Sequence, residues 1–237
     1  MQKHIPNAIT LFNLFFGCCA LVWAFEGRPD LSMLFLLGSF ACDTADGLVA
    51  RALGVSSELG TQLDSLSDVV SFGVVPGALL YGLMQNACCQ DASGICTAAL
   101  PAFLISMAAA YRLGKFNIDT RQTHYFLGLN TPLTTVLVLG LVLGAYHNRF
   151  GFGDWFLQNS WLLYPFVLLL AILMVSDVPL AGLKIKKIKW QGNEALFILV
   201  GVFLILLYFV KELAFALIIL IYIGYSLSIR KSILGQA

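Results

Sequence analysis

Four aspartates interrupt an otherwise apolar part of the chain between Asp43 and Asp68, where the sequence reads DTADGLVARALGVSSELGTQLDSLSD. Asp43 and Asp46 are three residues apart, and Asp64 and Asp68 are four residues apart. Either spacing puts both side chains of a pair on one face of an α-helix. A tight turn at residues 54–58 would make the two helices antiparallel neighbours. We therefore expect the four carboxylates to converge in one cavity.

The composition around these aspartates is that of a membrane protein. Of the 237 residues, 59% are hydrophobic and 11% are charged, and the mean hydropathy is +0.85. Soluble domains carry about 25% charged residues, so a water-soluble globule is excluded. The 14 Lys and Arg residues stand against 13 Asp and Glu residues, a net charge of +1. This balance leaves no basic excess for electrostatic binding of nucleic acid.

Apolar segments recur along the whole chain. A membrane-spanning helix needs about 20 apolar residues, and connections between helices are short. We therefore predict an all-α, polytopic membrane bundle of about eight transmembrane helices. It forms one domain over residues 1–237, with catalytic helices at about 5–146 and C-terminal helices at about 160–229. The predicted helices cover residues 5–25, 31–53, 59–84, 97–113, 126–146, 160–176, 194–210 and 213–229.

The basic residues divide unequally between the two sides of such a bundle. Only Arg28, Arg149 and Lys211 fall on one side. Because basic residues accumulate on the cytosolic side of a membrane protein, we predict that both termini and the aspartates face the cytosol. The basic residues on that side are Lys3, Arg51, Arg112, Lys115, Arg121, Lys184, Lys186, Lys187, Lys189, Arg230 and Lys231.

Small residues and cysteines give further expectations. The G-x-x-x-G spacings at 73–77 and 140–144 predict close approach between helices. Three cysteines share one short connection, and if that connection faces an oxidising compartment, Cys96 could pair with Cys88 or with Cys89. Unpaired thiols are the alternative.

Carboxylates at membrane depth need a positive partner. On insertion scales each costs about 2.5–3.5 kcal/mol, so four unpaired carboxylates would cost about 10 kcal/mol. Arg51 is the only basic side chain in the two helices and cannot neutralise four charges. Two divalent cations would, and a set of oxygen ligands favours Mg²⁺ or Mn²⁺. Paired divalent ions commonly assist displacement at phosphorus.

Two other interpretations of the aspartates stay open. The side chains could cap helices or form ion pairs, and an ion-coupled transporter also places carboxylates within the membrane. Gly47 and Gly60 favour a bound substrate instead, because glycines leave the backbone bare where a bulky ligand approaches.

The aspartate stretch resembles the signature of the CDP-alcohol phosphatidyltransferase family, D-x-x-D-G-x-x-A-R followed after about eight residues by G-x-x-x-D-x-x-x-D. Every fixed position is filled: Asp43, Asp46, Gly47, Ala50, Arg51, Gly60, Asp64 and Asp68. The resemblance implies the helical membrane fold of that family. It also implies that the four aspartates bind two divalent cations and that Asp68 is the general base.

The same resemblance implies contacts to CDP-diacylglycerol. Asn7 and Thr10 belong to a P-N-x-x-T stretch similar to the one that opens the family's first helix, although both could simply cap that helix. The implied contact residues are Asn7, Thr10, Gly47, Ala50, Arg51, Ser57 and Gly60.

Three segments are similar to bacterial-type phosphatidylserine synthases, namely residues 64–77, 111–117 and 126–132. Lys115 stands where an Arg is usual, and Asn130 stands where a Pro is usual. Serine carries a carboxylate and an ammonium group, for which Arg112, Lys115 and Asn117 offer hydrogen-bonding groups. The alternative is that the basic residues only set the orientation in the membrane.

The resemblance thus implies transfer of a phosphatidyl group from CDP-diacylglycerol to the hydroxyl of L-serine, giving phosphatidylserine and CMP. It also implies a homodimer among membrane lipids, in a bacterial inner membrane, with no nucleic-acid partner. Another acceptor, such as glycerol 3-phosphate or an inositol phosphate, is the alternative within the family. An ion-coupled transporter is the alternative outside it.

Overall fold

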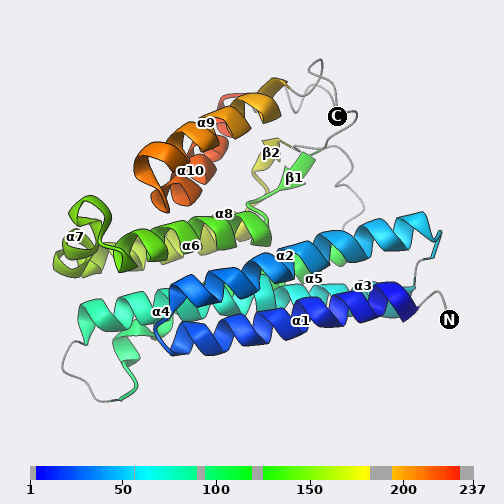
Figure 1. Ribbon diagram of the computed structural model, residues 1–237, viewed down its shortest axis with the longest axis horizontal. Coiled ribbons are helices and arrows are strands. Elements are labelled where there is room, and N and C mark those ends of the chain that lie inside the picture. The colour runs from blue at the N-terminus through cyan, green and yellow to red at the C-terminus, as the bar shows by residue number, and fades with distance from the viewer. Residues whose placement is uncertain (1–3, 56, 90–93, 119–124, 182–193, 230–237) are drawn as a thin grey trace.

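The computed structural model describes residues 4–55, 57–89, 94–118, 125–181 and 194–229, which are almost entirely helical (Figure 1). This confirms the predicted all-α class. The long helices are α1 (His4–Phe25), α2 (Pro29–Ala52), α3 (Glu58–Val69), α4 (Val75–Cys88), α5 (Leu104–Ile118), α6 (Thr131–Tyr146), α8 (Leu163–Val175), α9 (Glu194–Val210) and α10 (Leu213–Ser228). Short elements are the π-helical η1 (Val70–Val74), the 3-10 turns η2 (Thr97–Phe103), η3 (Arg149–Gly151) and η4 (Ser160–Leu162), helix α7 (Phe152–Gln158), and strands β1 (Tyr125–Leu127) and β2 (Pro179–Ala181).

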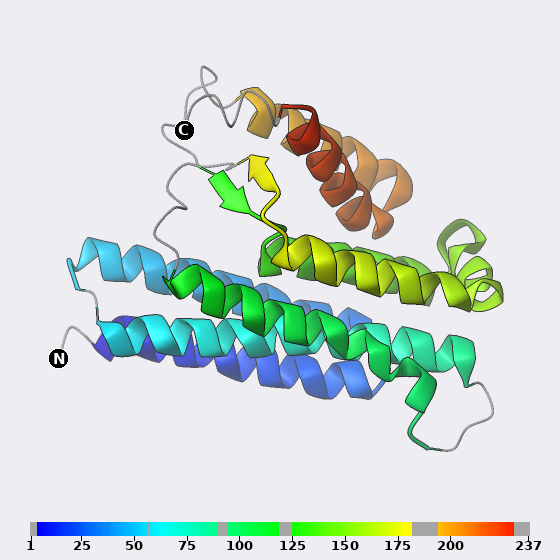
Figure 2. The ribbon, with the colours of Figure 1, turned by 180° about the vertical axis from the view of Figure 1, so that it is seen from behind.

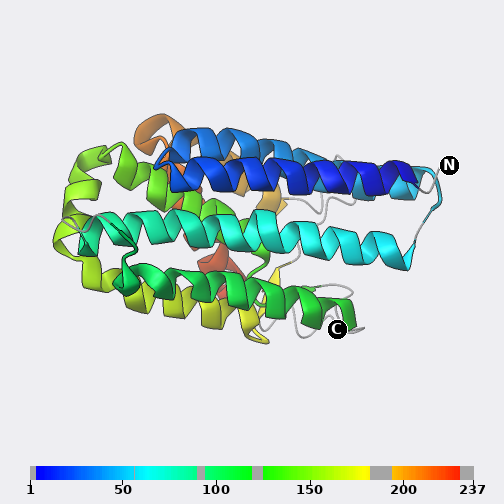
Figure 3. The ribbon, with the colours of Figure 1, turned by 90° about the horizontal axis from the view of Figure 1, so that it is seen from below.

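The helices are stacked in three groups. Figures 1 and 2 show α1 to α5 side by side in one group, α6 and α8 against it, and the α9–α10 pair on the far side of α6. Figure 3 shows α4 between the α1–α2 pair and α5. The beginning of α1 and the α2–α3 turn lie together at one end of the molecule. We call this end the aspartate end.

Not all of the predicted helices are long enough to cross a membrane alone. Within the described residues, four helices are long and apolar enough to span a membrane, and there is a fifth span if the bent pair formed by residues 149–158 and 160–175 counts as one. The apolar helices α6, α9 and α10 are shorter. Helix α6, with 16 residues, is about 24 Å long at 1.5 Å per residue, against a bilayer core of about 30 Å.

The predicted helix at 126–146 is wrong in its first residues. Tyr125–Leu127 forms a strand that pairs antiparallel with Pro179–Ala181, and the helix begins only at Thr131. Gly128 causes the break, because its φ of +69° is left-handed and its backbone packs against three carbonyl groups at the end of α8. Asn130 then caps α6 by accepting a hydrogen bond from Leu133 N at 2.9 Å.

A second difference from prediction is helix α7, which falls between the predicted helices ending at 146 and beginning at 160. It is bent by 89° from α8. Left-handed backbone at Asn148, Phe150 and Gly151 turns the chain out of α6. This short helix lies at the end of the molecule opposite the aspartates (Figure 1).

Helices α3 and α4 form one continuous rod because hydroxyl groups from neighbouring helices satisfy its irregular centre. Pro76 has no N–H to donate to the carbonyl of Phe72, four residues earlier. Thr135 of α6 donates to that carbonyl at 3.1 Å, and Ser106 of α5 donates to the Gly73 carbonyl at 2.9 Å. The π-helical turn thus begins two residues after Asp68 without leaving these carbonyls unpaired.

The glycine spacings mark helix contacts, as predicted. A Cβ at Gly140 or Gly144 would overlap Ala216 or Leu213 of α10, and a Cβ at Gly73 would overlap Ala109 of α5. At these positions the bare backbone lets two helices approach closely.

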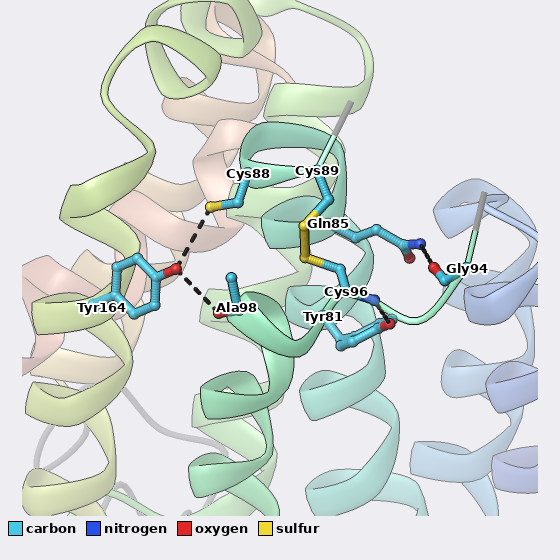
Figure 4. Close-up of a disulfide and its surroundings, with 8 residues drawn as sticks. All are labelled: Tyr81, Gln85, Cys88, Cys89, Gly94, Cys96, Ala98 and Tyr164. Atoms are coloured by element: carbon cyan, nitrogen blue, oxygen red, sulfur yellow. Dashed lines mark hydrogen bonds between the residues drawn. A yellow bond between two sulfur atoms is a disulfide. The ribbon is translucent and has the colours of Figure 1, made fainter. Parts of the chain in front are cut away.

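One of the open cysteine pairings is present. Cys89 and Cys96 form a disulfide between the end of α4 and the start of η2 (Figure 4). Cys88 is free, and its sulfur lies 3.6 Å from the hydroxyl of Tyr164. The backbone N–H of Cys96 donates to the Tyr81 hydroxyl at 3.1 Å. The end of α4, which this disulfide joins to η2, lies at the end of the molecule opposite the beginning of α1 (Figure 1).

Candidate active site

The turn between α2 and α3 brings the two aspartate pairs to the same end of the molecule. Gly54, with a φ of +63°, follows the end of α2. The Ser57 hydroxyl then caps α3 by accepting a hydrogen bond from Gly60 N at 3.0 Å. Both aspartate pairs lie within one to three turns of this connection, so they share one level in the bundle.

Three of the four carboxylates form a tight cluster. Asp43, Asp64 and Asp68 each offer a carboxylate oxygen, and these oxygens all lie within 4.8 Å of one another. Asp46 lies beside the cluster and accepts a hydrogen bond from the Thr10 hydroxyl at 2.5 Å. Asp46 and Asp68 are buried, whereas Asp43 and Asp64 are half-buried.

Helix α1 is the element that joins the two pairs, which the sequence did not predict. It packs along both α2 and α3, whereas α2 and α3 make few direct contacts with each other. The expectation that α2 and α3 are packed neighbours is therefore wrong. Thr10 of α1 bonds to Asp46 on one side, and its carbonyl accepts a hydrogen bond from Ser67 at 3.1 Å on the other.

The cluster has the properties of a divalent-cation site. Oδ1 of Asp64 is buried and has no hydrogen-bond partner among the residues that the structure describes. Among the described residues, no Arg or Lys forms an ion pair with any of the four aspartates. Clustered carboxylates without a cationic side chain suit a hard cation such as Mg²⁺ or Mn²⁺. The residues present therefore fit the metal that the sequence predicts.

A cavity of about 200 Å³ opens beside the cluster. Asn7 and Thr10 face it from inside α1, so neither caps that helix. The guanidinium of Arg51 lies next to Gly47, with Nη1 3.4 Å from the position of a Cβ on that glycine. The residues lining the cavity are Pro6, Asn7, Thr10, Asp46, Gly47, Ala50, Val55, Ser57, Gly60, Thr61 and Asp64.

The predicted serine contacts lie in the last turns of α5 and have different partners. Asn117 Nδ2 donates to the hydroxyl of Ser65, the residue after Asp64, at 2.8 Å. Lys115 pairs with Asp177 at 2.7 Å. Arg112 is 7% exposed, and its Nε is buried without a partner. Arg112 and Lys115 line a separate small cavity against the end of α8.

Sequence reasoning missed three polar residues next to Asp68. Asn13, Ser39 and Ser71 are completely buried. Both serines hydrogen-bond to the side chain of Asn13, and Asn13 bonds to Asp68. A signal for Asn13 was present, because it follows Thr10 by three residues and so shares its helix face.

Comparison with known proteins covers most of the chain. The family model described as CDP-alcohol phosphatidyltransferase matches residues 3–172. A Helicobacter pylori (strain ATCC 700392 / 26695) protein named CDP-diacylglycerol–serine O-phosphatidyltransferase is 33% identical over 207 residues, covering 86% of this chain and 81% of the relative. A protein of that name from Methanocaldococcus jannaschii is 31% identical, and the match covers 73% of this chain and 72% of that relative. One from Mycobacterium leprae is 30% identical, and the match covers 74% of this chain and 57% of that relative. The chain therefore belongs to the CDP-alcohol phosphatidyltransferase family.

Proposed function

We propose that this protein transfers the phosphatidyl group from CDP-diacylglycerol to the hydroxyl of L-serine, producing phosphatidylserine and CMP. The observation that carries the proposal is the three-carboxylate cluster beside a cavity lined by the family signature. The choice of serine is supported by the names of the relatives, which are about one third identical over most of the chain.

In this reaction the serine oxygen attacks the phosphorus attached to the lipid. A new P–O bond forms to serine, and the bond between that phosphorus and the oxygen shared with CMP breaks. The serine proton passes to Asp68, and CMP leaves with the bond electrons. Two divalent cations held by Asp43, Asp46, Asp64 and Asp68 would neutralise the charge that develops on the phosphoryl oxygens.

The residues that line the cavity would contact different parts of CDP-diacylglycerol. Gly47 and Gly60 leave room for the nucleotide, since a Cβ at Gly60 would lie 3.0 Å from the side chain of Asn7. Arg51 lies next to Gly47 and would support the diphosphate. The proposed contacts to CDP-diacylglycerol remain Asn7, Thr10, Gly47, Ala50, Arg51, Ser57 and Gly60.

The proposed serine contacts are Arg112, Lys115 and Asn117. Arg112 supports this role because a buried guanidinium with a free Nε is suited to an anion such as a carboxylate. Asn117 supports it because it bonds to Ser65, the residue that follows Asp64 in the sequence. Lys115 would contact serine by exchanging its present partner, Asp177, for the serine carboxylate.

The test is release of CMP by the purified protein from CDP-diacylglycerol with Mn²⁺ or Mg²⁺, with and without L-serine, and with EDTA as a control. We expect serine-dependent, EDTA-sensitive release with phosphatidylserine as product. Release only with glycerol 3-phosphate or an inositol phosphate would replace the acceptor but keep the reaction. Absence of CMP release with every acceptor would favour the ion-coupled transporter.

The general base is tested separately. Asp68→Asn should abolish turnover in a folded protein because the amide cannot accept the serine proton. Asp154→Asn, an exposed substitution at the opposite end, is the matched control. Near-normal activity of Asp68→Asn would contradict the assignment of Asp68.

We also propose the setting of the reaction. The protein would lie in a bacterial inner membrane as a homodimer, with the aspartate end toward the cytosol. The described residues Arg51, Arg112 and Lys115 at that end support this orientation. Mass measurement in detergent, corrected for bound detergent, tests the dimer, and a monomeric mass would exclude it.

A further inference from the structure

Asn13 is a polar side chain in the middle of an apolar helix. It lies on the buried face of α1 between Thr10 and Gly17 and is 0% exposed. Its Nδ2 donates a hydrogen bond to Oδ1 of Asp68 at 3.1 Å. Burying an amide is unfavourable unless its hydrogen bonds are made, and the bond to Asp68 satisfies the Nδ2 donor of Asn13.

Two serines determine which way the amide of Asn13 points. Ser71 donates to Oδ1 of Asn13 at 2.9 Å, and Ser39 makes a short hydrogen bond to the same oxygen. Both serines are completely buried. If the amide turned over, its oxygen would face a carboxylate oxygen of Asp68 with no donor between them. The two hydroxyls therefore hold the NH₂ group toward Asp68.

Three elements have to meet for this arrangement. Asn13 comes from α1, Ser39 from α2, and Ser71 from the π-helical turn that follows Asp68. Asp68 and Ser71 are three residues apart, so both face α1. A Cβ at Gly17 would overlap the hydroxyl of Ser71. A larger residue at Gly17 would push Ser71 away from Asn13.

We propose that Asn13, Ser39 and Ser71 form a positioning unit for Asp68, in which the hydrogen bond from Asn13 to Oδ1 fixes the orientation of the carboxylate. This inference rests on the proposed function, in which Asp68 is the general base. The three residues act through Asp68 and not on the substrate. Misplacing a reacting group by about 1 Å can lower a rate about 10²-fold, so the unit should affect kcat.

A matched pair of serines on α2 provides the first test. Ser39 and Ser32 are both completely buried, and each donates to an α1 carbonyl, at 3.1 Å and 2.9 Å. Only Ser39 also reaches the side chain of Asn13. We expect Ser39→Ala to lower kcat about tenfold with both KM values unchanged, and Ser32→Ala to leave kcat unchanged. Equal kcat values for the two variants would overturn the proposal.

A second test asks whether the residues act as one unit. We expect Asn13→Leu to lower kcat about 10²-fold. Adding Ser39→Ala and Ser71→Ala to Asn13→Leu should lower kcat no further, because residues that act as a unit are not additive. Multiplicative losses would show independent effects and contradict the unit. If Asn13→Leu does not fold, the comparison of Ser39→Ala with Ser32→Ala tests the proposal alone.

The outcomes separate this inference from the proposed function. Serine-dependent CMP release together with an unimpaired Ser39→Ala would reject the unit and keep the function. If another alcohol proves to be the acceptor, the same variants measured with that alcohol would support or reject the unit. Absence of CMP release with every acceptor would overturn both.

Discussion

The short hydrogen bond between Thr10 and Asp46 ties the first helix to the signature. The Thr10 hydroxyl lies 2.5 Å from Oδ2 of Asp46 and 3.0 Å from the carbonyl of Pro6. Thr10→Val keeps the shape but removes the hydroxyl, so Asp46 loses the partner that orients it. Because such supporting bonds are worth about 10–100-fold, we expect kcat/KM to fall by that factor in the CMP-release assay.

Thr134→Val is the matched control for Thr10→Val. Thr134 is completely buried and donates to the carbonyl four residues earlier, Asn130 O, at 3.0 Å. Thr10 makes the same local bond, and only Thr10 reaches an aspartate. Equal activities of the two valine variants would show that the bond to Asp46 does not matter.

The unpaired oxygen of Asp64 leads us to predict that this residue contributes to metal binding. Oδ1 of Asp64 is buried without a partner, as expected for an atom that binds a cation. Asp64→Asn should weaken Mn²⁺ binding at least tenfold, measured by electron paramagnetic resonance of free Mn²⁺ in a titration of the purified protein. The Asp154→Asn control should bind like the unmodified protein. Unchanged Mn²⁺ affinity in Asp64→Asn would remove Asp64 from the metal site.

Residues within one helix were predictable, and residues that meet across helices were not. The spacing of Asp43 and Asp46 puts them on one face regardless of what surrounds them. Asn13, by contrast, is a single amide in an apolar run, and its partners are 26 and 58 residues away in the sequence. Only packing of α1 against two other elements gives it a role.

At the scale of elements, the close packing of α10 against α6 requires two glycines of α6, Gly140 and Gly144. A Cβ at Gly140 would overlap the backbone of Ala216, where no side-chain movement could relieve the contact. Gly140→Val should therefore lower the free energy of unfolding by about 1–3 kcal/mol, measured by thermal unfolding in detergent. Gly201→Ala on α9, where a Cβ meets open space, should be neutral or slightly stabilising. Equal effects would contradict this packing interpretation.

The turn between α9 and α10 is held to η3 by an ion pair. Arg149 donates to both carboxylate oxygens of Glu212, at 2.8 Å and 3.0 Å. These hydrogen bonds lower the pKa of Glu212 from 4.5 to about 2. Because the folded pKa is lower than the unfolded one, the pair stabilises the fold above about pH 4.5, and this contribution is lost as the pH falls toward 2.

The variant Glu212→Gln tests this pH dependence. We expect its Tm to be lower than that of the unmodified protein by about 2–4 °C at pH 7. The difference should shrink as the pH falls below 4.5, because the unmodified protein then loses the same interaction. Glu26→Gln, an exposed change at the same end of the molecule, controls for lost charge. A pH-independent difference would exclude the ion pair as its cause.

Helices were easier to predict than the irregular connections between them. Apolar length alone predicts a helix such as α1, because in a bilayer the backbone must satisfy its own hydrogen bonds. The β1–β2 ladder joins residues 125–127 to 179–181, and three-residue strands are too short for a periodic pattern. Likewise, α7 depends on left-handed residues at 148, 150 and 151, and nothing in the sequence marks Phe150 for that conformation.

At the scale of the whole molecule, the two ends differ in chemistry. The aspartate end carries the carboxylate cluster and the cavity of the family signature. The opposite end carries the disulfide and exposed aromatic residues, among them Phe150, Trp155 and Trp161. Aromatic residues of this kind gather at the membrane–water interface. A single orientation therefore suits both ends: cytosolic substrates at one and an oxidising compartment at the other.

The disulfide makes this orientation measurable. Right-side-out vesicles are first treated with membrane-permeant N-ethylmaleimide, which blocks the free thiols, then with an impermeant reductant and an impermeant maleimide. We expect Cys89 and Cys96 to be labelled only after reduction, and only in right-side-out vesicles, because the structure places both at the end opposite the aspartates. A variant with Cys89→Ser and Cys96→Ser should give no labelling. Labelling only in inverted vesicles would reverse the proposed orientation and place the aspartates on the side away from the cytosol.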